Sequence, residues 1–288
     1  MKAIDRLGWV AGISFVSYGR RVGIRVSAAS ALSALDACLP PLRRRTSSPV
    51  VERLYSFVVG GDASGSVRRF HIVHADANRL ARTLDLRVAC DSLENDLRLY
   101  LAEQSRGRVF LHAGVVGWRG RALVIAGRSM SGKSSLVAAL VRAGATYYSD
   151  EYAVLDAHGR VHPYSAPLSI RGEPGTNPVR VSAEELGGRS GIAPLPVGLF
   201  AIPEYREGAR WRPRTLSTGR GMLALLANTF PIRSRPAQAL KAIETAVSRA
   251  PVLHGRRGEA EETVEPLLSA LESLPPITIR SRRAKEVR

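Results

Sequence analysis

The chain has 288 residues, of which 45% are hydrophobic and 23% charged, a balance that is typical of a globular protein and excludes a disordered or collagen-like chain. The formal net charge is +17, but the basic residues are scattered and only four of them are lysine, so the charge predicts no specific nucleic-acid partner. Two cysteines, Cys38 and Cys90, are too few for a disulfide framework, and no apolar run is long enough to cross a membrane, so we expect a cytoplasmic protein without a membrane partner.

Residues 1–105 are expected to form a smaller N-terminal α+β portion, to which the sequence assigns no role. Alternating apolar residues predict strands, and apolar residues at helical spacing predict helices. Turn-forming residues between these runs, such as Pro40 and Gly60, mark the boundaries. The expected elements are two short strands within 9–26, a helix over 30–39, strands over 50–59 and 67–73, and a helix over 80–105.

Residues 106–288 are expected to form a second domain of the α/β class. β-rich runs cover 109–116 and 121–126, and the second run leads directly into a glycine-rich loop. Gly144 stands where a residue in the left-handed conformation ends a helix. The further elements expected in chain order are a helix over 133–143, a strand over 146–149, a hairpin of 152–156 and 160–164, a proline- and glycine-rich stretch over 163–213, and helices over 219–227, 236–249 and 260–274.

The glycine-rich loop matches the phosphate-binding pattern G-x-x-x-x-G-K-S at every fixed position. Glycines let successive backbone N–H groups approach phosphate oxygens, and the helix that follows adds the positive end of its dipole. Lysine supplies a mobile charge for the terminal phosphates, and the hydroxyl after it suits Mg²⁺. The pattern therefore predicts a site for ATP and Mg²⁺, with the cofactor-binding residues Gly127, Ser129, Ser131, Gly132, Lys133, Ser134 and Ser135.

Three further motifs surround this loop. An acidic pair, Asp150 and Glu151, follows the loop lysine by seventeen and eighteen residues. Before the loop lies Phe-Leu-His-Ala-Gly-Val at 110–115, and after the pair lies Leu-Ser-Ile-Arg-Gly at 168–172. This order of motifs, over about a quarter of the chain, resembles the HPr kinase/phosphorylase family and, more distantly, ATP-dependent phosphoenolpyruvate carboxykinase. The resemblance implies an α/β P-loop core of that type beside the smaller N-terminal α+β portion.

The resemblance also implies a role for each catalytic candidate. Asp150 would be the general base that takes the proton of the acceptor hydroxyl, and His112 would sit beside it and tune its ionisation. Glu151 would hold Mg²⁺ together with Ser134. Arg171, like the loop lysine, would contact a phosphate or the substrate.

The chain departs from the family at two of these positions, and each assignment has a structural alternative. The family usually has aspartate where Glu151 stands and glutamate where Ser169 stands, and the second change argues against the reverse, phosphorolytic reaction. The acidic pair can be a solvated turn, His112 a core histidine, and Arg171 a partner in a surface ion pair. A glycine turn before a helix can also be purely structural.

We expect an ATP-dependent kinase that transfers the γ-phosphoryl group to a hydroxyl, either on serine of a peptide or protein or on a small metabolite. A nucleotide-dependent ATPase or switch without a phosphoryl acceptor is the main alternative, and a nucleic-acid-binding protein ranks last. The identity of the acceptor, the choice among ATP, GTP and pyrophosphate, and assembly into a homo-oligomer stay open.

Overall fold

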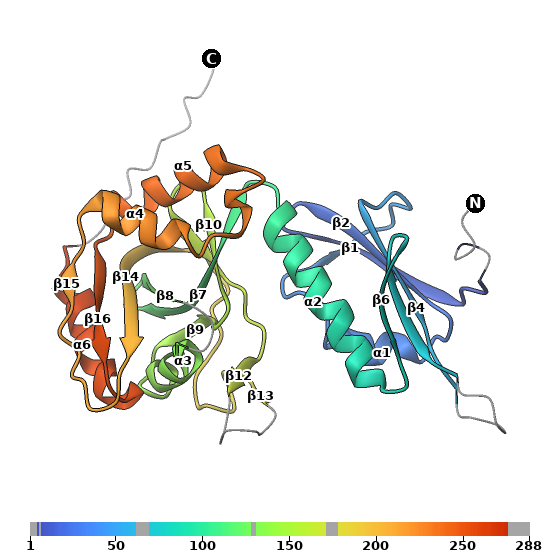
Figure 1. Cartoon of the computed structure of the whole chain (residues 1–288), viewed down its shortest axis with the longest axis horizontal. Helices are drawn as coiled ribbons and strands as arrows, with labels where there is room; N and C mark the ends of the chain where they lie inside the picture. The colour runs from blue at the N-terminus through green and yellow to red at the C-terminus, as the bar shows by residue number, and fades with distance from the viewer. Residues whose placement is uncertain (1–4, 6, 62–68, 128–130, 171–177, 276–288) are drawn as a thin grey trace, which may run out of the picture. The chain divides into compact units, whose positions relative to one another are not determined.

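The computed structural model describes residues 5, 7–61, 69–127, 131–170 and 178–275. The chain is a mixed α/β protein that folds as two compact units, residues 1–110 and 111–288 (Figure 1). Each unit has its own main sheet and its own hydrophobic core. Within the described ranges, no helix has the length and apolar character needed to span a membrane.

The N-terminal unit contains β1 (Ala11–Ser17), β2 (Arg20–Val26), α1 (Ala31–Asp36), β3 (Arg44–Arg45), β4 (Arg53–Val58), β5 (His71–Ala75), β6 (Asn78–Thr83) and α2 (Leu86–Gln104). Its six strands form one sheet in the order β3-β1-β2-β4-β5-β6. Both helices contribute to the core of this sheet: Leu35 of α1 and Leu97 of α2 are buried together with Phe15 and Tyr55.

The prediction for this unit was wrong at the start of α2. The helix predicted over 80–105 begins at Leu86, and residues 80–83 belong to β6. Asp85 sets the boundary, because its side chain accepts a hydrogen bond from the backbone N–H of Arg87 at 2.8 Å and caps the helix. The two strands predicted within 9–26 are confirmed, and α1 is shorter than predicted. The strand predicted over 67–73 is found at 71–75, and residues 67 and 68 lie outside the described part.

The remaining elements are β7 (Arg108–Trp118), β8 (Arg121–Ala126), α3 (Lys133–Arg142), β9 (Thr146–Ser149), β10 (Tyr152–Asp156), β11 (Arg160–His162), β12 (Leu168–Ile170), β13 (Val179–Val181), β14 (Leu195–Tyr205), β15 (Arg214–Thr215), α4 (Thr218–Leu226), the 3₁₀ helix η2 (Phe230–Ile232), α5 (Pro236–Val247), β16 (Val252–Arg257) and α6 (Ala260–Ser273). Eight of these strands form one sheet in the order β11-β10-β7-β8-β14-β16-β15, with β9 beside β7. The strands β12 and β13 form a separate antiparallel pair.

The arrangement of this sheet decides where a ligand can bind. Its three neighbouring strands β8, β14 and β16 are parallel, so their carboxyl ends meet at one edge. Helices α3 and α6 pack on one face, and α4 and α5 pack on the other (Figure 1). Contact between α3 and β7 is close, because a Cβ on Gly114 would lie 2.5 Å from Cγ2 of Val137. The glycine loop leaves β8 at the carboxyl edge, where open α/β sheets bind their ligands.

Three strands of this sheet were not predicted, namely β14, β15 and β16. No strand was expected in the proline- and glycine-rich stretch 163–213, yet β14 lies there, and β16 was missed between α5 and α6. A strand covered by helices on both faces of its sheet lacks the alternating pattern of a half-buried strand, and the prolines of β14 obscure the signal further. In contrast, the bounds of β7 to β11 and of α3 to α6 agree with the predictions to within two residues at each end.

Candidate functional site

The 127–134 segment joins the carboxyl end of β8 to the N-terminus of α3. Gly132 precedes the helix with a φ of +77°, a left-handed conformation that glycine adopts without strain. A Cβ there would lie 2.3 Å from a guanidinium nitrogen of Arg257, so any other residue would displace the end of that side chain. The first backbone N–H groups of α3 have no carbonyl partner within the helix, and together with the helix dipole they favour an anion at this point.

The side chain of Lys133 is buried at the same place. Its Nζ donates a hydrogen bond to the Gly127 carbonyl oxygen at 2.9 Å and lies 3.1 Å from Nε2 of His112. Because a protonated lysine only donates hydrogen bonds, Nε2 of His112 would be the acceptor in this contact. Burial lowers the pKa of Lys133 to about 8, although the carboxylates of Asp150 and Glu151 oppose the shift. A bound anion would stabilise the charge that burial disfavours.

Ser131 offers a polar atom that lacks a partner. Its Oγ is buried and makes no hydrogen bond with the described part of the chain. A Cβ on Gly127 would lie 2.9 Å from this oxygen, so the glycine leaves room beside it. A buried hydroxyl without a partner is costly, and a phosphate oxygen would remove that cost. The residues present therefore fit a phosphate group.

Asp150 follows β9 and is the centre of a second set of contacts. Its Oδ2 accepts hydrogen bonds from the Ser134 hydroxyl at 3.0 Å and from the backbone N–H of Ser169 at 3.1 Å. Its Oδ1 lies 3.2 Å from the hydroxyl of Tyr147. Burial, and next to it the negative charge of Asp150, raise the pKa of Tyr147, which therefore stays protonated as a donor. The residue suggested as general base thus lies against the hydroxyl suggested as a Mg²⁺ ligand.

The remaining site residues suggested by the sequence are Glu151, Ser135, Ser129 and Arg171. The backbone N–H of Glu151 donates to the Ser149 hydroxyl at 3.1 Å, which fixes the main chain directly after Asp150. Ser135 is exposed in the first turn of α3, and Ser129 and Arg171 lie outside the described residues.

For two residues the structure shows a contact that the resemblance did not name. His112 was expected beside Asp150, and the structure places it against Lys133. Ser134 was expected to share a metal ion with Glu151, and the structure pairs its hydroxyl with Asp150.

Aromatic side chains and the main chain hold the ring of His112. Its backbone N–H donates to the Asn228 carbonyl oxygen at 2.8 Å. The imidazole makes edge contacts with Tyr152 and Phe230, at centroid distances of 6.5 and 6.4 Å. The segment around Asn228, which follows α4, is therefore part of the wall beside Lys133.

Sequence reasoning missed Arg257, the last residue of β16. It is 2% exposed, and its guanidinium donates to the carbonyl oxygens of Gly132 at 2.9 Å and Gly258 at 2.7 Å. Its Nε has no hydrogen-bond partner, and within the described residues no carboxylate forms an ion pair with this side chain. Burial lowers the pKa of Arg257, and Glu259 nearby opposes that shift. A buried charge without a counter-ion is expensive, which suggests that an anion belongs beside it.

The oxygens available to a metal ion are few. The described residues contain no group of three or more histidine, cysteine, aspartate or glutamate side chains that could hold a metal ion. Mg²⁺ at phosphate sites takes one or two protein oxygens and completes its shell with water and phosphates. Ser134 and Asp150, which are in contact, supply oxygens of that kind.

Known proteins resemble the chain only distantly. No family model and no curated protein matches it. Among solved structures, it is similar to the HPr(Ser) kinase/phosphatase from Coxiella burnetii, at 14% identity and a TM-score of 0.31, over 57% of this chain and 95% of that chain. At these values the similarity carries no argument about function, which has to come from the residues of the site.

Proposed function

We propose that the protein is an ATP- and Mg²⁺-dependent phosphotransferase that moves the γ-phosphoryl group to an acceptor hydroxyl, on serine of a peptide or protein or on a small metabolite. One observation carries the proposal: the carboxylate of Asp150 accepts a hydrogen bond from Ser134, which directly follows the buried Lys133 in the first turn of α3. Lys133 in turn donates to the carbonyl oxygen of Gly127, at the start of the glycine-rich segment. A phosphate cradle beside a carboxylate is the arrangement that transfer to a hydroxyl requires.

The phosphates would be bound by the backbone N–H groups that open α3, by the orphaned hydroxyl of Ser131 and by Lys133. Ser129 and Ser135 are further candidates in the same segment. Mg²⁺, held through Ser134 and Glu151, would neutralise negative charge on the group in transfer. Arg171 keeps its suggested role as a contact to phosphate or substrate.

Asp150 is the proposed general base. Its carboxylate takes the proton of the acceptor hydroxyl while the hydroxyl oxygen forms a bond to the γ-phosphorus. The bond between that phosphorus and the bridging oxygen breaks, and ADP leaves with the electron pair. Hydrogen bonds from Ser134 and the Ser169 backbone orient the carboxylate for this step.

His112 is proposed to position Lys133. The 3.1 Å contact between Nζ and Nε2 supports this role over a direct effect on Asp150. A neutral imidazole accepts a hydrogen bond from the ammonium without repelling it, so Lys133 stays charged and available to the incoming phosphates.

Transfer of labelled γ-phosphate tests the proposal. The protein is incubated with γ-labelled ATP, Mg²⁺ and a mixture of serine peptides, proteins or metabolites, with Lys133→Ala as the control. We expect label on an acceptor with the unchanged protein and none with Lys133→Ala. Release of free phosphate without a labelled acceptor would contradict a phosphotransferase and favour an ATPase or switch.

The affinity for ATP is expected to fall as the pH rises above about 8, where Lys133 loses its proton in the protein without nucleotide. Phosphates bind the protonated form, so binding above this pH must take up a proton, and the affinity declines by up to about tenfold per pH unit. Calorimetric titration in two buffers of different ionisation enthalpy measures both the affinity for ATP and the number of protons taken up on binding. A constant affinity without proton uptake above this pH would show that Lys133 is not the group that contacts the phosphates.

A further inference from the structure

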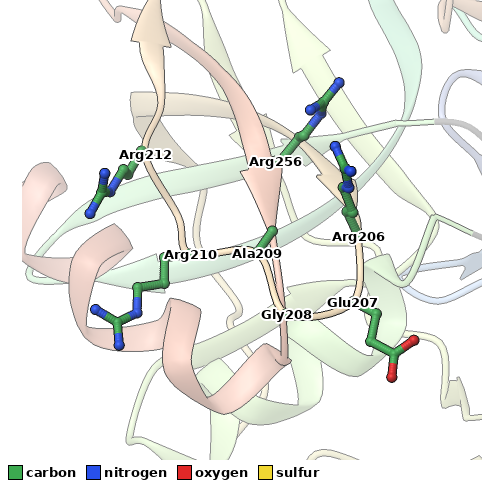
Figure 2. Close-up of a pocket in the computed structure, with 7 residues that line it drawn as sticks. All are labelled: Arg206, Glu207, Gly208, Ala209, Arg210, Arg212 and Arg256. Atoms are coloured by element: carbon green, nitrogen blue, oxygen red, sulfur yellow. The ribbon is translucent and has the colours of Figure 1, made fainter.

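A basic pocket lies at the carboxyl ends of β14 and β16, apart from the contacts described so far. Its volume is about 550 Å³, and its lining includes Arg206, Arg210, Arg212 and Arg256 together with Glu207 (Figure 2). The first three arginines belong to the loop between β14 and β15, and Arg256 is the penultimate residue of β16. The pocket is therefore built where two parallel strands end.

The four arginines of this pocket are exposed and unpaired. Within the described residues, none of their guanidinium groups forms an ion pair or hydrogen bond. Some arginines elsewhere form ion pairs with carboxylates, as Arg20 does with Glu52 at 2.7 Å. The single carboxylate of the lining, on Glu207, points away from the guanidinium groups in Figure 2. Like charges gathered without a counter-ion repel one another, so the pocket favours an anionic ligand.

The pocket lies at the same carboxyl edge of the sheet as the site proposed for phosphoryl transfer. Arg257, which donates to the Gly132 carbonyl oxygen, directly follows Arg256 in β16. Neighbouring side chains of a strand point to opposite faces, so at the end of β16 Arg257 faces Gly132 and Arg256 faces the pocket. An acceptor bound in the pocket would thus lie at the same carboxyl edge of the sheet as the glycine loop.

The directions of the side chains indicate the kind of anion. Arg206 and Arg256 extend the same way, whereas Arg210 and Arg212 extend toward the other side of the pocket (Figure 2). Two separated pairs suit several carboxylates spaced along a chain better than one compact anion, because a guanidinium binds a carboxylate through two parallel hydrogen bonds. A nucleic acid would need a longer basic stripe along its backbone than one pocket provides.

We propose that this pocket binds carboxylates of an acidic peptide segment that carries the acceptor serine. The inference rests on the proposed phosphotransferase function and narrows its acceptor to an acidic peptide. Contacts at the pocket would hold the segment while its serine hydroxyl reaches Asp150.

Two fluorescein-labelled peptides test this proposal by fluorescence anisotropy. Both carry one central serine, flanked by glutamates in one peptide and by glutamines in the other. We expect the unchanged protein to bind the glutamate peptide at least about tenfold more tightly than the glutamine peptide. The double variant Arg206→Gln/Arg256→Gln is expected to lose most of this preference.

The matched control is Arg44→Gln/Arg45→Gln, which removes the same charge from exposed positions of β3. It should keep the preference within about twofold, because neither residue lines the pocket. Equal losses in both double variants would show that general charge attracts the peptide, and would overturn the proposal. The proposal would also fail if the unchanged protein showed no preference, or if single-stranded RNA bound the arginines more tightly than the glutamate peptide.

ATP affinity, measured on the same proteins, separates this inference from the proposed function. Tight ATP binding that Lys133→Ala removes, without a preference for glutamate, would defeat the pocket proposal alone. Glutamate preference without ATP binding would defeat the phosphotransferase and leave an acidic-peptide site.

Discussion

Replacement of Asp150 by asparagine is expected to slow phosphoryl transfer by about 10²- to 10⁴-fold, the usual contribution of a general base. Asparagine keeps an oxygen that can accept the hydrogen bonds from Ser134 and the Ser169 backbone, which Asp150 accepts at 3.0 and 3.1 Å. The loop should therefore stay folded, and ATP affinity should change by less than about threefold. What the amide cannot do is take up the acceptor proton. Single-turnover transfer and direct titration with ATP measure the two effects separately.

The Mg²⁺ concentration needed for half-maximal transfer shows whether Asp150 acts as the general base or as a metal ligand. Ser134→Ala is the matched variant, because it removes the hydroxyl that contacts Asp150 and that would hold Mg²⁺. We expect Ser134→Ala to raise the Mg²⁺ concentration needed for half-maximal transfer, and Asp150→Asn to leave it nearly unchanged while the maximal rate falls. If Asp150→Asn instead raised the Mg²⁺ requirement and recovered its rate at saturating Mg²⁺, Asp150 would be a metal ligand and the base would have to be another group.

The sequence was sufficient where structure is set by neighbours in the chain. The span from β8 through α3 to β10 was predicted almost residue by residue, because each step has a local signal. Apolar runs predict the strands, glycines end the turns, and Gly144, with a φ of +96°, stops α3. These local signals also placed Lys133 and Asp150 in consecutive elements, although only the fold shows their contacts.

The residues contributed by β14 and β16 could not be found in this way. The two strands pair in parallel with each other, and β14 also pairs in parallel with β8, so both depend on pairing across long stretches of chain, as in the register of Tyr205 with Arg257. Among 42 basic residues, nothing in the sequence marks Arg257 as buried or Arg256 as a pocket residue. The contact of His112 with Lys133 is likewise a product of packing between β7 and α3, whereas the resemblance to HPr kinases implied Asp150 as its neighbour.

Arg257 provides the second test of the site, because its replacement by methionine should separate stability from function. Methionine fills the buried volume and removes the unpaired charge, but it leaves the carbonyl oxygens of Gly132 and Gly258 without this donor, so we expect the unfolding free energy to fall by no more than about 2 kcal/mol. Transfer is expected to fall by about 10²-fold or more, because a preorganised positive group beside Gly132 would be lost where phosphate charge gathers. Thermal or chemical unfolding measures the first quantity, and single-turnover transfer the second.

The control for this test is Arg142→Met, which removes a charge from an exposed position at the far end of α3 and should leave transfer unchanged. Arg257→Lys restores the charge but offers one ammonium in place of the planar guanidinium that reaches both Gly132 and Gly258. A partial recovery with lysine would show that Arg257 acts on the phosphates through its charge. If methionine unfolded the protein while lysine preserved both stability and full activity, the residue would serve only to hold β16 against the loop, and the phosphates would depend on Lys133 and the start of α3 alone.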